Sequence, residues 1–478
     1  MLLLTGGVSR SLRPTWRVSS SEQEESSEVA MTEDHAGPHS AANNADMHSV
    51  RLRYGLNETD SWWHFALGPA RNRIWQLHRE MRIQIIRIFL FDKNAPDPLN
   101  EWNLFRSYVN AVLAVGATPM VTFAKFRRPF DDARAVRWFA EQCGEIVWHC
   151  LEEWGEERVR DWHWCVWNEP NSDWIGGGLS FEQYQDIYES VAHSILRWLK
   201  PCLGSRRAPI GGPAVEGFQP FWKDWIWRFV AEVDADLIGF VNWHRYADWR
   251  DHGEKGAPPD AATHEAVMLW QARDYEVRAR SVARLIREPG VLNVCGEWNA
   301  HSHYLPRVRA RFNQTLFGAA YGASALLHLI RGGVDAEMLW TGTDDACGYG
   351  VLGPDAAPTP LYFARRLCAQ YIQYGDTIVA PTLDDAVPGL DGVVVRSSNG
   401  RSSAVLIHRE QTATTYDVSE ITRGELSDNC ALIKIDCETG NTVTTGPCGG
   451  TVTFAGYGVA VVTNAVVGYD VSSQAEST

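Results

Sequence analysis

Residues 162–171 read Trp162-His163-Trp164-Cys165-Val166-Trp167-Asn168-Glu169-Pro170-Asn171, an aromatic run that ends in an acidic residue before proline. The apolar part of this run predicts a buried strand. Downstream, Ser180 and Gln183 have the spacing of a capping box, which predicts that a helix begins there. The stretch therefore predicts one strand followed by one helix, with Glu169 at the carboxyl end of the strand.

The same alternation of a short apolar strand and an amphipathic helix runs from about residue 48 to residue 375. Further strands are predicted over residues 85–91, 119–123, 208–212, 237–242, 291–295 and 336–340. Strands that alternate with helices over this length imply a parallel sheet, and eight repeats close it into a barrel. We therefore predict an α/β fold, a (β/α)8 TIM barrel over residues 47–375, with its chemistry at the carboxyl ends of the strands.

The sequence changes character after about residue 376. Short segments rich in Val, Ile and Thr alternate with turn residues, which predicts a C-terminal accessory β-sandwich domain over residues 376–470. Its expected role is to support the barrel, and carbohydrate binding is the alternative. Residues 471–478 are predicted to be a short C-terminal tail.

Residues 1–46 are rich in Ser, Glu, Ala and Asn, so they have little to bury and are predicted to be a disordered N-terminal tail. Whether this tail is genuine stays open, because Met31 and Met47 are alternative starts. No apolar run approaches the roughly 20 residues of a membrane span, and the N-terminus lacks the pattern of a secretory signal. We therefore expect a cytoplasmic protein that contacts no membrane, with secretion left open.

Charge and cysteine usage narrow the partners further. The chain of 478 residues carries a formal net charge of −15, which disfavours nucleic acid as a partner and favours a neutral or weakly charged substrate. The ten cysteines do not form the dense framework of a small disulfide-rich domain, and no metal-ligand spacing stands out. We interpret Cys165 and Cys295 as buried thiols. One disulfide among Cys430, Cys437 and Cys448 is left open by the sequence.

A second acidic residue in similar surroundings lies 128 positions after Glu169, in Val294-Cys295-Gly296-Glu297-Trp298-Asn299. Two carboxylates on separate strands can flank a glycosidic bond, one as acid/base and one as nucleophile. The alternative for each is a helix cap or a solvated loop residue. Because both occur within one strand–helix repeat pattern, the catalytic interpretation is favoured. The 21 tryptophans fit it too, since indole rings stack on sugars.

The motif Trp167-Asn168-Glu169-Pro170-Asn171 resembles the acid/base strand of clan-A barrel glycosidases. Further motifs make the chain similar to glycoside hydrolase family 39, which contains β-xylosidases, α-L-iduronidases and other retaining glycosidases. These motifs are Phe181…Tyr184…Tyr188, Ile210-Gly211-Gly212-Pro213-Ala214, Trp243-His244-Arg245-Tyr246 and Gly296-Glu297-Trp298-Asn299. The resemblance covers about residues 50–375, and it departs from the family at Gly296, where Thr is common.

The resemblance implies roles for the residues that match the family's motifs. Glu169 matches the general acid/base and Glu297 the nucleophile. Asn168 matches the amide that contacts the substrate 2-hydroxyl. His244 and Tyr246, placed after the sixth strand, match residues that line the site, and Tyr246 is placed to hydrogen-bond Glu297.

Two further residues are implied at other strands. Trp340, ending the eighth strand, matches the aromatic platform beneath the reacting sugar. Arg87, on the second strand, is expected near the nucleophile, where it would keep that carboxylate ionised. The alternatives are a barrel-filling ion pair for Arg87, a satisfied core histidine for His244, and packing alone for Tyr246 and Trp340.

A general acid must hold its proton at the working pH. An apolar surround should therefore raise the pKa of Glu169, and the neighbouring Trp164, Trp167 and Trp174 are expected to supply it. Trp174 is also expected to contact the substrate.

These expectations define a retaining glycoside hydrolase that acts by a two-carboxylate double displacement, most simply a β-xylosidase-like exo-glycosidase. Two carboxylates and a water complete the cycle, so no cofactor and no metal are expected. Alternatives are a glycosidase of arabinosyl, galactosyl, glucosyl or uronyl specificity, exo or endo, and a non-catalytic carbohydrate-binding barrel. An oligosaccharide or glycoside is the expected partner, and the oligomeric state is not readable from the sequence.

We predict that removal of residues 1–46 leaves activity and melting temperature nearly unchanged. The segment is polar and has no apolar periodicity, so it has little to pack against the body. Thermal denaturation of the full and shortened chains checks this, and a large drop in melting temperature would contradict it.

Overall fold

The computed structural model describes residues 49–465, apart from 92–95, 125–132, 174, 176, 218–220, 248–260, 301–313, 345–347, 381–382, 384–386, 428 and 441. The predicted tails over 1–46 and 471–478, and Trp174, lie outside the described residues. No helix within the described ranges is long and apolar enough to cross a membrane.

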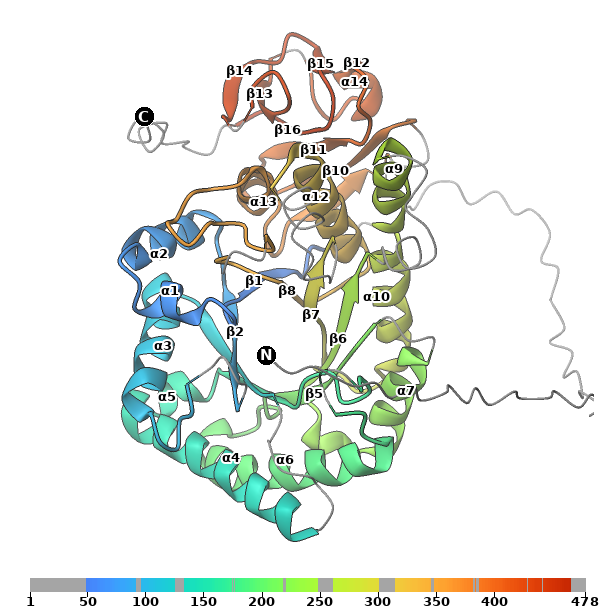
Figure 1. Ribbon diagram of the computed structural model, residues 1–478. Helices are drawn as coiled ribbons and strands as arrows, with labels where there is room; N and C mark the ends of the chain where they lie inside the picture. The colour runs from blue at the N-terminus through green and yellow to red at the C-terminus, as the bar shows by residue number, and fades with distance from the viewer. Residues whose placement is uncertain are drawn as a thin grey trace, which may run out of the picture. The chain divides into compact units, whose positions relative to one another are not determined.

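Eight parallel strands close into a barrel, and helices surround it (Figure 1). The barrel closes because β1 pairs with both β2 and β8. The strands are β1 (Arg53–Asn57), β2 (Ile85–Leu90), β3 (Thr118–Phe123), β4 (His163–Val166), β5 (Ile210–Val215), β6 (Phe240–Tyr246), β7 (Leu292–Asn299) and β8 (Ala336–Leu339). The predicted TIM barrel is therefore confirmed.

The helices follow the strands as the sequence pattern predicts. They are α1 (Trp62–Ala66), α2 (Arg71–Glu80), α3 (Trp102–Val115), α4 (Ala133–Trp154), α5 (Glu156–Val159), α6 (Phe181–Leu203), α7 (Trp222–Glu232), α9 (Ala261–Gln271), α10 (Asp274–Leu285), α12 (Leu316–Arg331) and α13 (Pro360–Tyr371). The capping box at the start of α6 is formed, because the Ser180 hydroxyl accepts from the Gln183 N–H and the Gln183 side chain accepts from the Ser180 N–H.

The sixth strand lies further along the chain than the predicted span of 237–242. A short 3-10 helix, η1 (Ala235–Leu237), precedes it, and the Asp234 side chain caps that turn by accepting from the Asp236 N–H. β6 begins at Phe240 and extends to Tyr246, since its last residues pair with β7, His244 with Glu297 and Tyr246 with Asn299. The expectation that His244 and Tyr246 follow the sixth strand is wrong, since both lie within its carboxyl-terminal half.

Two apolar layers hold the barrel. A small cluster inside it includes Ile85, Met120, Cys165, Phe240 and Met338. A much larger cluster lies between the strands and the helices.

Trp164 and Trp167 belong to the larger cluster, where Trp167 packs edge-on against Phe139 of α4. They therefore pack outward between the barrel and its helices. The expectation that these two rings surround the Glu169 carboxyl is wrong. The pleat of β4 turns Trp164 to the outer layer. Trp167 follows the strand with a left-handed φ of 71°, which breaks the alternation, so its ring also lies in the outer layer.

The C-terminal region forms a six-stranded antiparallel sheet in the order β14-β13-β16-β11-β10-β9, and a separate pair, β12-β15. The elements are β9 (Thr377–Ala380), β10 (Leu390–Arg396), β11 (Ser402–His408), β12 (Thr414–Asp417), α14 (Val418–Ile421), β13 (Ala431–Ile435), β14 (Thr444–Pro447), β15 (Thr451–Phe454) and β16 (Gly458–Thr463). Cys430, Cys437 and Cys448 are free thiols, so no disulfide joins these three.

Both faces of the larger sheet are buried. In β10, Val393 and Val395 join the main core with α12 and α13, whereas Val394 joins the smaller core shared with β12, β15 and α14. This alternation follows the two-residue period of a strand. The barrel-side helices α12 and α13 therefore share one continuous core with the accessory sheet.

A buried charged cluster joins α12 to this sheet. The carboxylate of Asp391, in β10, accepts from Arg331 Nη2 at 2.8 Å and from the Ser324 hydroxyl at 2.5 Å, and it lies 3.4 Å from His328 Nε2. His328 Nδ1 lies 3.0 Å from Glu276 of α10. Burial alone would raise the pKa of Asp391, but Arg331 and His328 lower it more, so that pKa lies below its ordinary value.

For His328 the net shift of the pKa is upward instead. Burial lowers the pKa of His328, but its hydrogen bonds to Asp391 and Glu276 raise it more, so the pKa lies above its ordinary 6.5. The stability contributed by the charged imidazole is therefore fully present below pH 6.5 and is lost as the pH rises through the raised value in the folded protein.

We predict that Asp391→Asn lowers the free energy of unfolding by about 3–5 kcal/mol, because it leaves Arg331 buried without its counter-charge and leaves His328 with Glu276 alone. Urea denaturation measures this loss. It should also show that the wild type loses stability from pH 6.5 upward and that the variant loses less.

The control is Glu425→Gln, which removes the partner of Arg396 on an exposed part of the same sheet. An exposed ion pair of this kind contributes about 0–1 kcal/mol. Equal losses in the two variants would contradict a special role for the buried cluster.

Candidate active site

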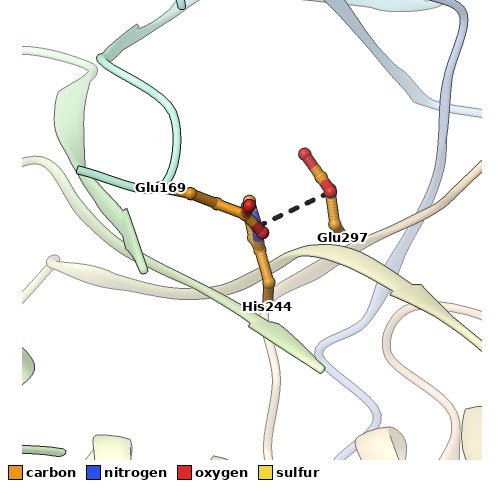
Figure 2. Close-up of side chains that lie close together, drawn as sticks. All are labelled: Glu169, His244 and Glu297. Atoms are coloured by element: carbon orange, nitrogen blue, oxygen red, sulfur yellow. Dashed lines mark hydrogen bonds and ion pairs between the residues drawn. The ribbon is translucent and has the colours of Figure 1, made fainter. Parts of the chain in front are cut away.

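The two glutamates singled out by the sequence meet at the carboxyl end of the barrel. Glu169 lies in the turn after β4, and Glu297 lies in β7. Both are almost fully buried, at 2% and 5% exposure. One oxygen of each carboxylate and Nδ1 of His244 lie within 4.8 Å of one another. Figure 2 shows the two glutamates extending toward each other with His244 between them.

Glu297 is held by two donors from neighbouring strands. Arg87 Nη1, from β2, donates to Oε1 at 2.6 Å. The Tyr246 hydroxyl, from β6, donates to Oε2 at 2.8 Å, as the sequence predicts. Each oxygen of the carboxylate therefore has a fixed direction in the barrel.

Burial and these donors act on the pKa of Glu297 in opposite directions. Burial raises that pKa and is the larger effect, while Arg87 and the Tyr246 hydroxyl lower it, and the net pKa lies above its ordinary 4.5. The expected arginine contact is present, but it offsets only part of the cost of burying the charge.

His244 contacts both carboxylates. Its Nδ1 lies 2.8 Å from Glu169 Oε1 and 3.6 Å from Glu297 Oε2. Burial, followed by the charge of Arg87, lowers the pKa of His244 well below 6.5, so the ring is neutral. A neutral imidazole at this place can donate to an ionised Glu169 or accept from a protonated one.

Arg87 connects the nucleophile candidate to the acid/base turn. Its side chain is 0% exposed, with Nη2 donating to Asn168 Oδ1 at 2.8 Å and Nε donating to the Thr122 hydroxyl at 2.9 Å. Arg87 thus lies beside the nucleophile candidate, as expected, and the same buried side chain orients Asn168 beside Glu169.

The turn that carries Glu169 has an unusual backbone. Trp167 and Glu169 have φ values of 71° and 48°, in the left-handed region that disfavours residues with a side chain. Asn171 holds the turn, since its Nδ2 donates to the Glu216 carbonyl at 3.2 Å and its Oδ1 accepts from the Glu216 N–H at 2.9 Å. The Glu169 N–H also donates to the Ala214 carbonyl at 2.9 Å.

Gly296, which stands where Thr is common in the family, has a steric explanation. A β-carbon at this position would lie 2.1 Å from Oδ1 of Asn242, a fully buried residue of β6. Asn242 itself donates to the Cys165 sulfur at 3.4 Å inside the barrel. Glycine therefore precedes Glu297 because the Asn242 amide fills the space that a threonine side chain would need.

Trp340 lies at the same end of the barrel. It follows β8 and packs with Phe89, Ala124, Tyr246 and Tyr349 in a separate apolar cluster. The structure thus brings together every predicted site residue that it describes, at the carboxyl ends of β2, β4, β6, β7 and β8.

Asn57, at the end of β1, was not identified from the sequence. Its Nδ2 donates to the carbonyls of Gly296 at 3.0 Å and Met338 at 3.1 Å, so it ties β1 to the strand of Glu297 and to β8. The run Arg53–Asn57 is short and gives little strand signal in the sequence. The signal available was an asparagine at the end of a short apolar run, and the structure shows that this residue is fully buried.

Glu169, His244 and Glu297 are also the one group of three possible metal ligands found among the described residues. The Arg87 guanidinium against Glu297 already supplies a positive charge there. Since a cation would be repelled by that guanidinium, the donor set fits a metal ion poorly.

Comparison with known proteins agrees with this geometry. Residues 102–322, which include both glutamates, match the sequence model of the family described as Glycosyl hydrolases family 39. A β-xylosidase of Caldicellulosiruptor saccharolyticus is 25% identical over 50% of this chain and 48% of its own length. A β-xylosidase of Geobacillus stearothermophilus is 32% identical over 46% of this chain and 43% of its own length. The matched part thus spans less than half the length of these relatives.

Solved structures show the same fold at low sequence identity. A monomeric β-xylosidase from Caulobacter crescentus has a TM-score of 0.60 and 16% identity, covering 87% of this chain and 97% of that chain. A family 51 α-L-arabinofuranosidase from Bifidobacterium longum has a TM-score of 0.60 and 15% identity, covering 87% and 96%. These structures show the shared fold, while the family predicted from the motifs, glycoside hydrolase family 39, is the one whose model residues 102–322 match.

Proposed function

We propose that this protein is a retaining glycoside hydrolase, with Glu169 as the acid/base and Glu297 as the nucleophile. The observation that carries the proposal is the pair of buried carboxylates with oxygens within 4.8 Å of each other. Retaining sites hold their two carboxyl groups about 5–5.5 Å apart, whereas inverting sites need about 6.5–9.5 Å to admit a water. The short approach in this barrel favours retention.

The first step of the proposed reaction breaks the glycosidic bond. A carboxylate oxygen of Glu297 attacks the anomeric carbon, and Glu169 gives its proton to the departing glycosidic oxygen. The electron pair of the broken bond leaves with that oxygen. A glycosyl ester on Glu297 results.

The second step reverses the roles. Ionised Glu169 takes a proton from a water, whose oxygen attacks the anomeric carbon and displaces Glu297. The sugar leaves with its original configuration because two inversions have occurred.

The surrounding residues support this division of labour. Arg87 and Tyr246 bind the ionised form of Glu297, which favours the attacking state. His244 stays neutral beside Glu169, so it can accompany that group through both of its protonation states. Asn168, oriented by Arg87, is placed to hydrogen-bond the substrate 2-hydroxyl.

The substrate that we propose is a β-xyloside, cleaved from the end of a short oligosaccharide. Its support is that two of the relatives that the chain matches are named β-xylosidases. A non-catalytic sugar-binding barrel is disfavoured, because the chain keeps both carboxylates and holds them with dedicated donors.

We predict that Glu169→Gln slows hydrolysis of substrates with poor leaving groups by about 10²–10⁴-fold, because the amide has no proton of suitable acidity to give. Activated aryl glycosides, which depart without protonation, should lose far less in their cleavage step. Burst-phase kinetics on matched aryl and alkyl xylosides measures both. Glu145→Gln, at a half-exposed position of α4, is the control, and equal losses on both substrate types would argue against the acid role.

We predict that Glu297→Ala is folded and nearly inactive, and that azide restores turnover with a glycosyl azide of inverted configuration as product. Azide fits the space left by the carboxylate and attacks from the nucleophile's face. The Glu169→Gln variant should instead give a glycosyl azide of retained configuration, because its covalent intermediate still forms on Glu297. Proton NMR of the first-formed products distinguishes the two, and an inverted wild-type product would refute retention.

A further inference from the structure

The outer face of the barrel carries a chain of aromatic rings that the reaction does not use. We call it the aromatic strip, and define it as Trp198 of α6, Trp148, His149 and Trp154 of α4, Trp102 of α3, and Trp162 before β4. Successive ring centroids are 6.0 Å apart for Trp198–Trp148, 4.5 Å for Trp148–His149, 5.2 Å for His149–Trp102, 5.9 Å for Trp102–Trp154 and 5.2 Å for Trp154–Trp162.

The strip runs from solvent into the protein. Trp148 and Trp198 are each 37% exposed, whereas Trp162 is 1% exposed. Trp102 and Trp154 are partly buried and pack against the main core. Core packing therefore explains the inner rings, but it does not explain two adjacent tryptophans kept at the surface of neighbouring helices.

The inner end of the strip opens on a cavity of about 540 Å³. Its wall includes Trp154, Trp162, Thr118, Glu157, Arg158 and Asp161. Thr118 begins β3 and Trp162 precedes β4, so the cavity lies at the amino ends of the strands. It is thus at the opposite end of the barrel from Glu169 and Glu297.

The polar groups of this cavity suit a ligand rich in hydroxyl groups. Asp161 and Glu157 offer acceptors, Arg158 offers donors, and all three side chains are exposed. A hydroxyl group can both donate and accept, so it can use both kinds of partner. Asp161 pairs with Arg206 at 2.7 Å and Glu157 lies 3.4 Å from Arg160, so the local charges are balanced, and the net charge of −15 disfavours a polyanion.

We propose that the aromatic strip and its cavity form a second carbohydrate site, which holds a neutral β-linked oligosaccharide away from the reaction centre. Exposed indole faces stack on the C–H faces of sugar rings, and the cavity groups bind the hydroxyls of the terminal residue. The choice of a β-1,4-linked xylan as ligand rests on the proposed function. The strip would keep the protein on a polymer while the barrel acts on chain ends.

The test compares the full-length wild type with Trp148→Ala/Trp198→Ala in affinity electrophoresis through gels that contain soluble β-1,4-linked xylan. We expect about tenfold weaker retention of the double variant, because it removes both exposed platforms. Turnover of a small aryl xyloside should be unchanged. Arg158→Ala tests the cavity without removing a ring and should also weaken retention. Trp227→Ala, which removes a tryptophan 51% exposed on α7, is the control and should change nothing.

Unchanged retention of the double variant would overturn the site, and unchanged retention of Arg158→Ala would overturn the part of it assigned to the cavity. The alternative partner of the strip is a second copy of this chain, and sedimentation velocity tests for it. If the double variant changes self-association and leaves retention on xylan unchanged, the strip is a contact between copies and the proposal is wrong. If the protein turned over no aryl glycoside, the proposed function would be wrong. The second site would still be supported if retention on xylan depended on the strip.

Discussion

The ion pair between Arg87 and Glu297 is the interaction on which the candidate site depends. Both groups are buried in the barrel, and their closest atoms are 2.6 Å apart. A carboxylate in this position would be strongly disfavoured without a counter-charge, and an unpaired guanidinium would be too. The pair also determines its neighbours, because Arg87 uses its remaining donors on Asn168 and Thr122. One cation thus fixes the orientation of groups from three strands.

The turn after β4 is the second constraint. A left-handed backbone at Trp167 and Glu169 costs free energy, because both residues have side chains. Contacts from the surrounding structure must therefore hold this conformation in place. The Asn171 amide does so by pairing with the backbone of Glu216 as a neighbouring strand would. The result directs the Glu169 carboxyl across the barrel toward His244 and Glu297, as Figure 2 shows.

The accessory sheet adds support on another side. One of its faces completes the core around α12 and α13, and the buried cluster of Asp391, Arg331 and His328 ties β10 to α12. The sequence pattern predicts short strands after residue 376, which the structure has. The larger sheet has both faces covered because its strands alternate apolar residues on both sides, as in Val393, Val394 and Val395.

The sequence by itself determined the strand–helix order, the barrel, the family and the two glutamates, because these depend on local periodicity and on short motifs. It did not determine which face of β4 the tryptophans occupy. Trp164 packs outward from β4, and Trp167 packs outward from the left-handed turn that follows the strand, away from the carboxyl that they were expected to surround. Nor did it place His244 and Tyr246 inside β6, since both belong to the strand through pairing with distant residues of β7.

Only the tertiary structure decided the contacts between residues distant along the chain. Asn57 reaches the strand of Glu297 across 239 positions, and Arg87 reaches Glu297 across 210. Gly296 is explained by Asn242, a residue of the neighbouring strand that no local pattern connects to it. The period of apolar residues in a segment indicates which of its faces is buried. Contacts between distant residues depend instead on the stagger between neighbouring strands of the closed barrel, which is a property of the whole barrel.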